Sequence, residues 1–290
     1  MPQTKRSRRS ANKSPLLTST LSARGPHAAD KHRLYEWAVQ CPEAEIDFVD
    51  GTFRKLRGRP ALILREDFCG TALTACEWVK RRPTNLAVGV DLSAPTLRWG
   101  EKNNLSLLTD EARARVTLLK RDVRDSGKEG TGADAVLAMN FSYWVFKTRD
   151  ALRGYFASVC STLANEGVFF LDHYGGYEAM KVQREPRHIR NRGGYTYVWD
   201  QASYNPINGD KVCHIHFEFR DGSKMNKAFT YSWRLWTLPE VQELLVEAGF
   251  KNATVYWEGD DNKGHGNGVF RPRRVGDACA SFIDYIVAEK

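Results

Sequence analysis

Short apolar runs alternate with helix-like segments through the first part of the chain. Each run is typical of a strand buried in a parallel sheet, and the runs occupy residues 61–64, 86–90, 116–119, 135–139 and 168–171. Helical periodicity marks residues 30–39, 73–80, 93–107 and 150–163. Because strands separated by helices form βαβ units, this pattern predicts a doubly wound, Rossmann-like α/β fold.

The pattern changes after the fifth apolar run. Three strands are predicted in succession at 195–203, 211–220 and 225–235, with Asn208-Gly209 and Asp221-Gly222 as hairpin turns. They predict an antiparallel β insertion over 195–235. A helix at 239–249, a Gly-rich loop at 259–268 and strands at 253–257 and 281–287 follow. We therefore expect one domain over 30–290 with a seven-stranded, mostly parallel sheet and this insertion after its fifth strand.

The net charge of +8 is concentrated at the start of the chain. Residues 1–29 contain six basic residues and no acidic one, so the rest of the chain carries only +2. Such a segment cannot bury enough apolar surface to fold, and we predict a disordered basic tail. An organelle transit peptide and a nucleic-acid-binding arm are the alternatives. The near-neutral remainder argues against a nucleic-acid partner.

Cysteine usage and the length of the apolar runs indicate the compartment. The six cysteines are scattered and form no C-x-x-C pair, which favours a reduced, cytoplasmic setting. No apolar run approaches the ~20 residues that cross a bilayer, so we expect no membrane contact.

Polar groups follow three consecutive strands. A glycine-containing turn, Phe68 to Ala72, joins the first strand to a helix, where free N–H groups and close backbone approach suit a ligand. Asp91 ends the second strand about 20 residues later, the offset at which a carboxylate meets ribose hydroxyls. Asp122 lies near the end of the third strand. These groups predict a nucleoside site, although each alone also fits a tight turn or a helix cap.

Four segments together resemble the class I S-adenosylmethionine (SAM) methyltransferases, in particular those acting on small molecules. Leu64 to Ala72 resembles the first motif, an acid, one residue and then G-C-G-T-G. Val88 to Ser93 resembles the second motif, and Arg121 to Val123 the adenine-contacting segment. Leu163 to Val168 resembles the turn before the fifth strand. Phe68 and Ala72 depart from the pattern, because the family usually has glycine there.

The resemblance implies SAM as the cofactor. Glu66 takes the place of the first-motif acid, Asp91 that of the ribose-binding acid, and Asp122 accepts from the adenine amino group. The expected cofactor-binding residues are therefore Arg65, Glu66, Phe68, Cys69, Gly70, Thr71, Asp91, Leu92, Asp122, Val123 and Asn140. Tyr35 is a further candidate, because its aromatic face could help to hold the cationic cofactor.

The resemblance also places the ends of the fourth and fifth strands beside the transferred methyl group. The candidate catalytic residues are therefore Tyr143, Asp172 and His173. His173 could take a proton from an acceptor near neutral pH, or be a structural imidazole. We expect no metal, because His214 and His216 share one strand face without a clear third ligand.

We therefore expect methyl transfer to nitrogen, oxygen or sulfur of a small molecule. A nucleic-acid methyltransferase is one alternative, since Asn140 and Tyr143 match the ends of the N-P-P-Y motif of base methyltransferases. A dinucleotide-dependent oxidoreductase and a non-catalytic nucleoside-binding protein are others. The insertion would cover the site or form a homodimer contact, because its many aromatic side chains must pack against something.

Overall fold

The computed structural model describes residues 30–261 and 265–290. The predicted disordered tail lies outside these residues. The described chain divides into two units, of which the first contains Pro42–Gly176 and Thr237–Lys290. The second contains residues 30–41 and Tyr177–Trp236.

The first unit is built on an eight-stranded sheet with the order β11-β10-β12-β5-β4-β1-β2-β3. Strands β1 to β5 are parallel, whereas β12 runs antiparallel to both β5 and β10, and β11 antiparallel to β10. The strands are β1 Ile63–Asp67, β2 Leu86–Asp91, β3 Val116–Lys120, β4 Ala133–Ala138, β5 Leu163–Gly175, β10 Asn252–Asp260, β11 Gly266–Pro272 and β12 Phe282–Glu289. The α/β fold class with a mostly parallel central sheet is confirmed.

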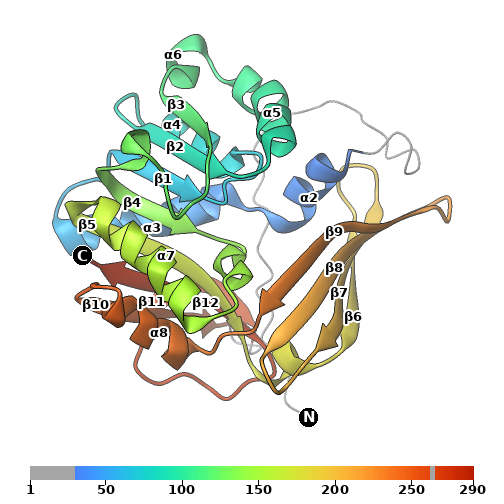
Figure 1. Ribbon diagram of the computed structural model, residues 1–290. Helices are drawn as coiled ribbons and strands as arrows, with labels where there is room; N and C mark the ends of the chain where they lie inside the picture. The colour runs from blue at the N-terminus through green and yellow to red at the C-terminus, as the bar shows by residue number, and fades with distance from the viewer. Residues whose placement is uncertain (1–29, 262–264) are drawn as a thin grey trace. The chain divides into compact units, whose positions relative to one another are not determined.

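Helices cover both faces of this sheet (Figure 1). They are α3 Pro42–Arg57, α4 Leu73–Arg81, α5 Ala94–Asn103, α6 Asp110–Arg113, α7 Arg149–Thr162 and α8 Leu238–Glu247, with the short turns η1 Leu105–Leu107, η2 Lys128–Gly130 and η3 Ser142–Val145. Neighbouring residues of β5 show the two layers. Phe170 packs edge-on against Phe48 of α3, whereas Phe169 packs against Phe156 of α7.

Helix α3 and strand β11 of the first unit were not predicted from the sequence. Helix α3 buries Ile46, Val49 and Phe53 at spacings of three and four residues, but Gly51 and many charges obscure that stripe. Strand β11 occupies part of the predicted loop 259–268 and is the eighth strand of the sheet. It is a mostly exposed edge strand, so it has no apolar alternation.

Strand β1 also extends further than its apolar run. The run predicted a strand at 61–64, yet Arg65, Glu66 and Asp67 continue it and are buried. The charges of Arg65 and Asp67 neutralise each other, since Arg65 Nε lies 2.9 Å from Asp67 Oδ1. A buried ion pair therefore lets polar residues occupy the centre of the sheet.

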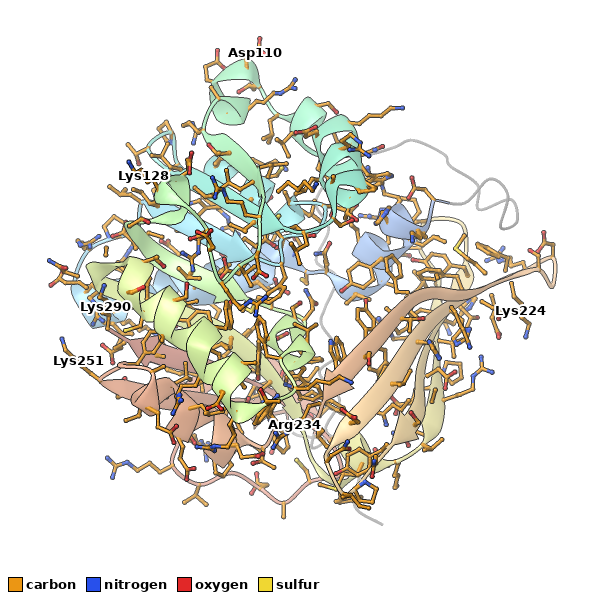
Figure 2. All side chains as sticks on the ribbon, viewed as in Figure 1. Asp110, Lys128, Lys224, Arg234, Lys251 and Lys290 are labelled. Atoms are coloured by element: carbon orange, nitrogen blue, oxygen red, sulfur yellow. The ribbon has the colours of Figure 1, made fainter. Side chains whose placement is uncertain are left out.

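The basic residue Lys290 follows β12 and lies at the C-terminal end of α7 (Figure 2). Its Nζ donates hydrogen bonds to Leu163 O at 2.7 Å and to Ser161 O at 3.3 Å. A cation here satisfies carbonyl groups that the helix leaves without partners. It thereby fixes the start of β5, the strand whose other end carries the candidate catalytic residues.

The described part of the second unit contains a four-stranded antiparallel sheet with the order β6-β7-β8-β9. Its elements are α2 Lys31–Val39, η4 Tyr177–Met180, β6 Gln183–Ile189, β7 Tyr195–Tyr204, β8 Asp210–Phe219 and β9 Lys224–Arg234. The antiparallel insertion after the fifth strand is confirmed. Strand β6 was not predicted, because Pro186 and its exposed charges are typical of an edge strand.

Helix α2 accounts for part of the aromatic content of the insertion. Leu34 and Ala38 of α2 share a core with Tyr195, Phe217 and Phe219. The Tyr195 hydroxyl donates to Leu34 O at 2.9 Å, and Arg187 donates to Ala38 O. These side chains therefore pack within their own unit.

No helix among the described residues has the length and apolar composition needed to cross a membrane. All six cysteines lie in the described part of the chain, and each is a free thiol.

Candidate active site

The turn after β1 follows a backbone path that favours glycine. Phe68, Gly70 and Ala72 all have φ between 54° and 57°. Phe68 and Ala72 are the two positions at which the motif usually has glycine, so the chain keeps the glycine-like path with larger residues. Each non-glycine residue in this region costs about 1–2 kcal/mol. Hydrogen bonds from Cys69 N to Val90 O (3.0 Å) and from Ala72 N to Cys69 O (2.8 Å) hold the turn.

Asp91 joins this turn to the end of β2. Its Oδ2 accepts a hydrogen bond from Gly70 N at 2.9 Å, and its Oδ1 accepts one from Ser93 N at 2.7 Å. Asp91 is half-buried, and each carboxylate oxygen can accept a second hydrogen bond. The adjacent Leu92 is 67% exposed. The carboxylate and this apolar side chain together suit a ribose and an adjoining base.

Two glycines let neighbouring elements approach the turn closely. A Cβ at Gly100 of α5 would lie 2.5 Å from Thr71 O, and one at Gly89 of β2 would lie 2.8 Å from Cys69 Sγ. Cys69 and Thr71 are themselves buried, so a ligand would meet their backbone rather than their side chains. Sequence analysis missed both glycines, because their function appears only when helix and turn pack together.

Glu66 holds the first helix turn of α4. Its Oε2 accepts a hydrogen bond from Ala75 N at 3.0 Å, and the side chain is buried. Burial, which disfavours the charged form, raises the pKa of Glu66 to about 8. The predicted first-motif acid thus connects β1 to α4, and its contact with a cofactor stays a prediction.

Arg65 is a fully buried residue of β1. Its fully buried guanidinium binds Asp67, and its Nη1 donates to Ser126 Oγ, Gly130 O and Thr162 Oγ1 at 2.8–3.0 Å. Tyr155 also donates to Asp67, at 2.9 Å. The side chain therefore supports the end of β1 from inside, whereas its predicted contact with a cofactor remains untested.

The end of β3 carries Asp122 and Val123. Arg124 donates to both oxygens of Asp122, with Nε 3.0 Å from Oδ1 and Nη2 2.7 Å from Oδ2. The Arg124 guanidinium lowers the pKa of Asp122 below its ordinary value. Val123 is buried, so it offers mainly its backbone. Sequence analysis missed Arg124, which competes with a ligand for this carboxylate.

The turn after β4 is held by Asp172 of β5. Asn140 and Phe141 are consecutive residues with φ of 59° and 57°. Asp172 Oδ2 accepts from Asn140 N at 2.9 Å, and its Oδ1 accepts from Phe141 N at 2.9 Å. Asp172 is only 2% exposed. Among the described residues, the side-chain amide of Asn140 has no hydrogen-bond partner.

Tyr143 and His173 form a buried pair. The Tyr143 hydroxyl and His173 Nδ1 are 3.0 Å apart, and the side chains are 0% and 1% exposed. Burial lowers the pKa of His173 to about 3, so its imidazole is neutral. It also raises the pKa of Tyr143 well above its ordinary value. Both predicted catalytic side chains therefore face the interior in this structure.

A third buried polar group, Asp284, was missed by sequence analysis. It lies on β12 directly opposite His173 in the antiparallel register and is fully buried. Neither carboxyl oxygen accepts a hydrogen bond from another residue that the structure describes. Burial and the nearby Asp172 raise the pKa of Asp284 well above its usual range. These surroundings favour the protonated, neutral form of this carboxyl group.

The remaining predicted residues lie in the second unit. The ring of Tyr35 on α2 packs against Phe229, with centroids 5.1 Å apart. His216 Nε2 lies 3.1 Å from Asp200 Oδ2, and His214 Nδ1 lies 2.9 Å from Thr230 Oγ1. Within the described ranges, no group of three His, Cys, Asp or Glu side chains has an arrangement that could hold a metal ion.

Comparison with known proteins relates this architecture to solved structures. CalS10 from Micromonospora echinaspora, an amino pentose methyltransferase of calicheamicin biosynthesis solved with SAM bound, has a TM-score of 0.64 and 18% identity, covering 89% of this chain and 95% of its own. The sugar N-methyltransferase KedS8 from Streptoalloteichus has a TM-score of 0.64 and 17% identity, and the match covers 97% of this chain and 98% of KedS8. A SAM-dependent methyltransferase from Clostridium acetobutylicum has a TM-score of 0.62 and 16% identity, and the match covers 88% of this chain and 96% of that enzyme.

No protein-family model and no curated protein sequence matches the chain. The structural similarity shows that the chain has the fold of SAM-dependent methyltransferases of known structure. The fold implied by the four sequence motifs is therefore confirmed.

Proposed function

We propose that this protein is a SAM-dependent methyltransferase that acts on a small molecule. The observation that carries the proposal is Asp91, which bridges two turns at the carboxyl ends of β1 and β2 and keeps further lone pairs for ribose hydroxyls. The fold supports it, because the solved structures with this fold include an amino pentose methyltransferase and a sugar N-methyltransferase.

The residues present fit the cofactor. Asp91 would hold the ribose, the exposed Leu92 would cover one face of the adenine, and the Phe68–Ala72 turn would bring backbone close to the methionyl part. SAM, when bound, supplies a methyl group that its sulfonium charge has already activated. The chain's own task is then to orient the acceptor and exclude water, rather than to create a strong electrophile.

We further propose that the acceptor atom is an amine nitrogen. Asn140 supports this choice, because its unpaired amide oxygen can accept an N–H of the acceptor and orient the nitrogen lone pair. An uncharged amine is already nucleophilic, so it needs no buried base. The interior positions of Tyr143 and His173 agree with such an acceptor better than with an alcohol.

Binding and turnover of the full chain test this function. SAM and its demethylated product should bind in calorimetry, and incubation of SAM with a panel of amino sugars and other small amines should give methylated product by mass spectrometry. Asp91→Ala should weaken this binding, whereas Asp110→Ala, which removes an exposed acidic side chain at the start of α6, is the control and should leave it unchanged. Absence of SAM binding, or tighter binding of NAD, would contradict the proposal.

The second unit contains a cluster of three aromatic side chains, of which Trp233 is buried and Trp199 and Tyr231 are partly buried. The rings of Tyr231 and Trp233 stack at 4.4 Å, and Trp199 lies 6.2 Å from each. We propose that this aromatic group, Trp199, Tyr231 and Trp233, selects the acceptor. Trp199→Ala should then raise the acceptor KM without changing SAM affinity. A change from dimer to monomer in light scattering, with unchanged KM, would instead assign the group to a homodimer contact.

We also propose a cytoplasmic location, which the six free thiols support. Fractionation of cells with an antibody against the chain tests it, and recovery in an organelle fraction would contradict it.

A further inference from the structure

Asn140 and Phe141 have a backbone conformation that needs external support. Both residues have φ near 60°, a left-handed conformation that non-glycine residues rarely adopt. A bulky aromatic residue disfavours this conformation more than asparagine does. Such a turn persists only where its surroundings hold it. It lies at the carboxyl end of β4, where the acceptor would meet the cofactor.

The support comes from one carboxylate. The two oxygens of Asp172 accept the N–H groups of Asn140 and Phe141, each at 2.9 Å. These two amides are adjacent in the chain, so a single side chain fixes both peptide planes. Asp172 is almost completely buried and lies on β5, the strand paired with β4. Its position relative to the turn is therefore set by the sheet.

The turn arranges side chains on the acceptor side. The ring of Phe141 packs with Trp144 at 5.5 Å and with Tyr174 at 5.8 Å between centroids. Relaxation of either residue to negative φ would swing this ring away and move the Asn140 amide with it. Small displacements of this kind are costly, because methyl transfer depends on close alignment of the reacting atoms.

We propose that Asp172 is a positioning residue, which holds the Asn140–Phe141 turn in its left-handed conformation and so aligns the acceptor, and is not the base of the reaction. The acceptor part of this inference rests on the proposed methyltransferase function. The two hydrogen bonds that Asp172 accepts do not depend on that function.

The variant Asp172→Asn keeps the size of the side chain but replaces one accepting oxygen with a donor. We expect kcat to fall by about tenfold or more while SAM affinity changes little. The pH profile of kcat should keep its shape, because no titrating base is lost. Loss of the acid limb of that profile would instead identify Asp172 as a base and overturn the proposal.

A double-mutant cycle with Phe141→Gly sharpens the test. Glycine adopts positive φ without cost, so it reduces the need for the carboxylate. The double variant D172N/F141G should therefore be at least about threefold more active than the product of the two single effects predicts. The control Val145→Gly, in the neighbouring turn η3, should show no such coupling with D172N. Additive effects for both glycine variants would refute the positioning function.

Hydrogen exchange tests the contact without any catalytic assay. The amides of Asn140 and Phe141 should exchange slowly in the wild type and at least about tenfold faster in D172N, while the amides of β4 stay protected. Unchanged exchange at both amides would refute the contact. If SAM does not bind but exchange responds as expected, the proposed function fails and the structural basis of the inference stands.

Discussion

The candidate site has two ends, each built around one aspartate. The first end, after β1 and β2, contains Asp91, and the second end, after β4 and on β5, contains Asp172. Asp91 and Asp172 each accept two backbone N–H groups through their two carboxylate oxygens, at 2.7–2.9 Å. Asp91 is half-buried and joins two separate turns, whereas Asp172 is buried and holds two adjacent residues of one turn. Exposure, more than residue type, therefore decides which carboxylate can bind a ligand and which one only holds the backbone.

Each end also contains a buried side chain that is neutral in the folded protein. Near the β1 end, Glu66 is buried against the start of α4 and has a raised pKa. Near the β5 end, His173 is buried against Tyr143 and has a lowered pKa. Both groups lose their charge on folding, but their effects on stability should have opposite pH dependence.

The largest effect is expected from the ion pair beneath the first end. Arg65→Met leaves the buried Asp67 without its cation, and we expect the free energy of unfolding to fall by about 3–5 kcal/mol. Urea denaturation measures this change. The double variant Arg65→Met/Asp67→Leu should lose less, because it buries no unpaired charge. A single variant as stable as the wild type would show that the pair does not support β1.

Glu66→Gln tests the first end by pH. The folded protein keeps a proton on Glu66 up to a pKa of about 8, whereas the unfolded chain releases it near its ordinary value of 4.5. Wild-type stability should therefore fall, relative to the variant, as the pH rises from 4.5 to 8. Between pH 5 and pH 7 the difference should change by up to ~3 kcal/mol. A difference independent of pH would contradict a protonated Glu66.

His173→Gln tests the second end, with the opposite sign. The folded protein keeps His173 neutral down to a pKa of about 3, whereas the unfolded chain binds a proton below 6.5. Wild-type stability should therefore fall, relative to the variant, as the pH drops below 6.5. Between pH 7 and pH 5 the loss should reach up to ~2 kcal/mol. If stability instead increases toward low pH, His173 is charged in the folded protein.

The smallest effect is expected at the turn after β1. Ala72→Gly relieves a positive φ but adds freedom to the unfolded chain, so the net change in unfolding free energy should be under about 1 kcal/mol. Ala75→Gly within α4 is the matched control. It should lower the unfolding free energy by about 1 kcal/mol, because glycine disfavours the interior of a helix. Equal destabilisation by both variants, measured in the same melts, would argue against the left-handed turn.

Sequence reasoning predicted the first end better than the second for a physical reason. Gly70 and Asp91 lie in turns that follow apolar strands, and parallel strands bring such turns together whatever the details of packing. Local pattern was therefore enough. Phe68 and Ala72 looked like departures from the motif, but the backbone keeps a glycine-like conformation at both.

The second end depends on packing that no local pattern contains. His173 is buried because β12, more than 100 residues later in the chain, pairs with β5 and places Asp284 opposite it. The contact between Asp172 and the β4 turn likewise joins positions 31 and 32 residues apart. The sequence could place these residues at a strand end, but it could not predict that they are buried.

Titration of SAM into wild type, Asp91→Ala and Asp172→Asn by calorimetry distinguishes the functions of the two carboxylates. Asp91 should bind the ribose, so its loss should weaken SAM affinity by roughly tenfold or more. Asp172 should only shape the turn, so its variant should change affinity by less than about threefold. Comparable losses in both variants, or unchanged affinity in Asp91→Ala, would contradict this division of functions between the two carboxylates.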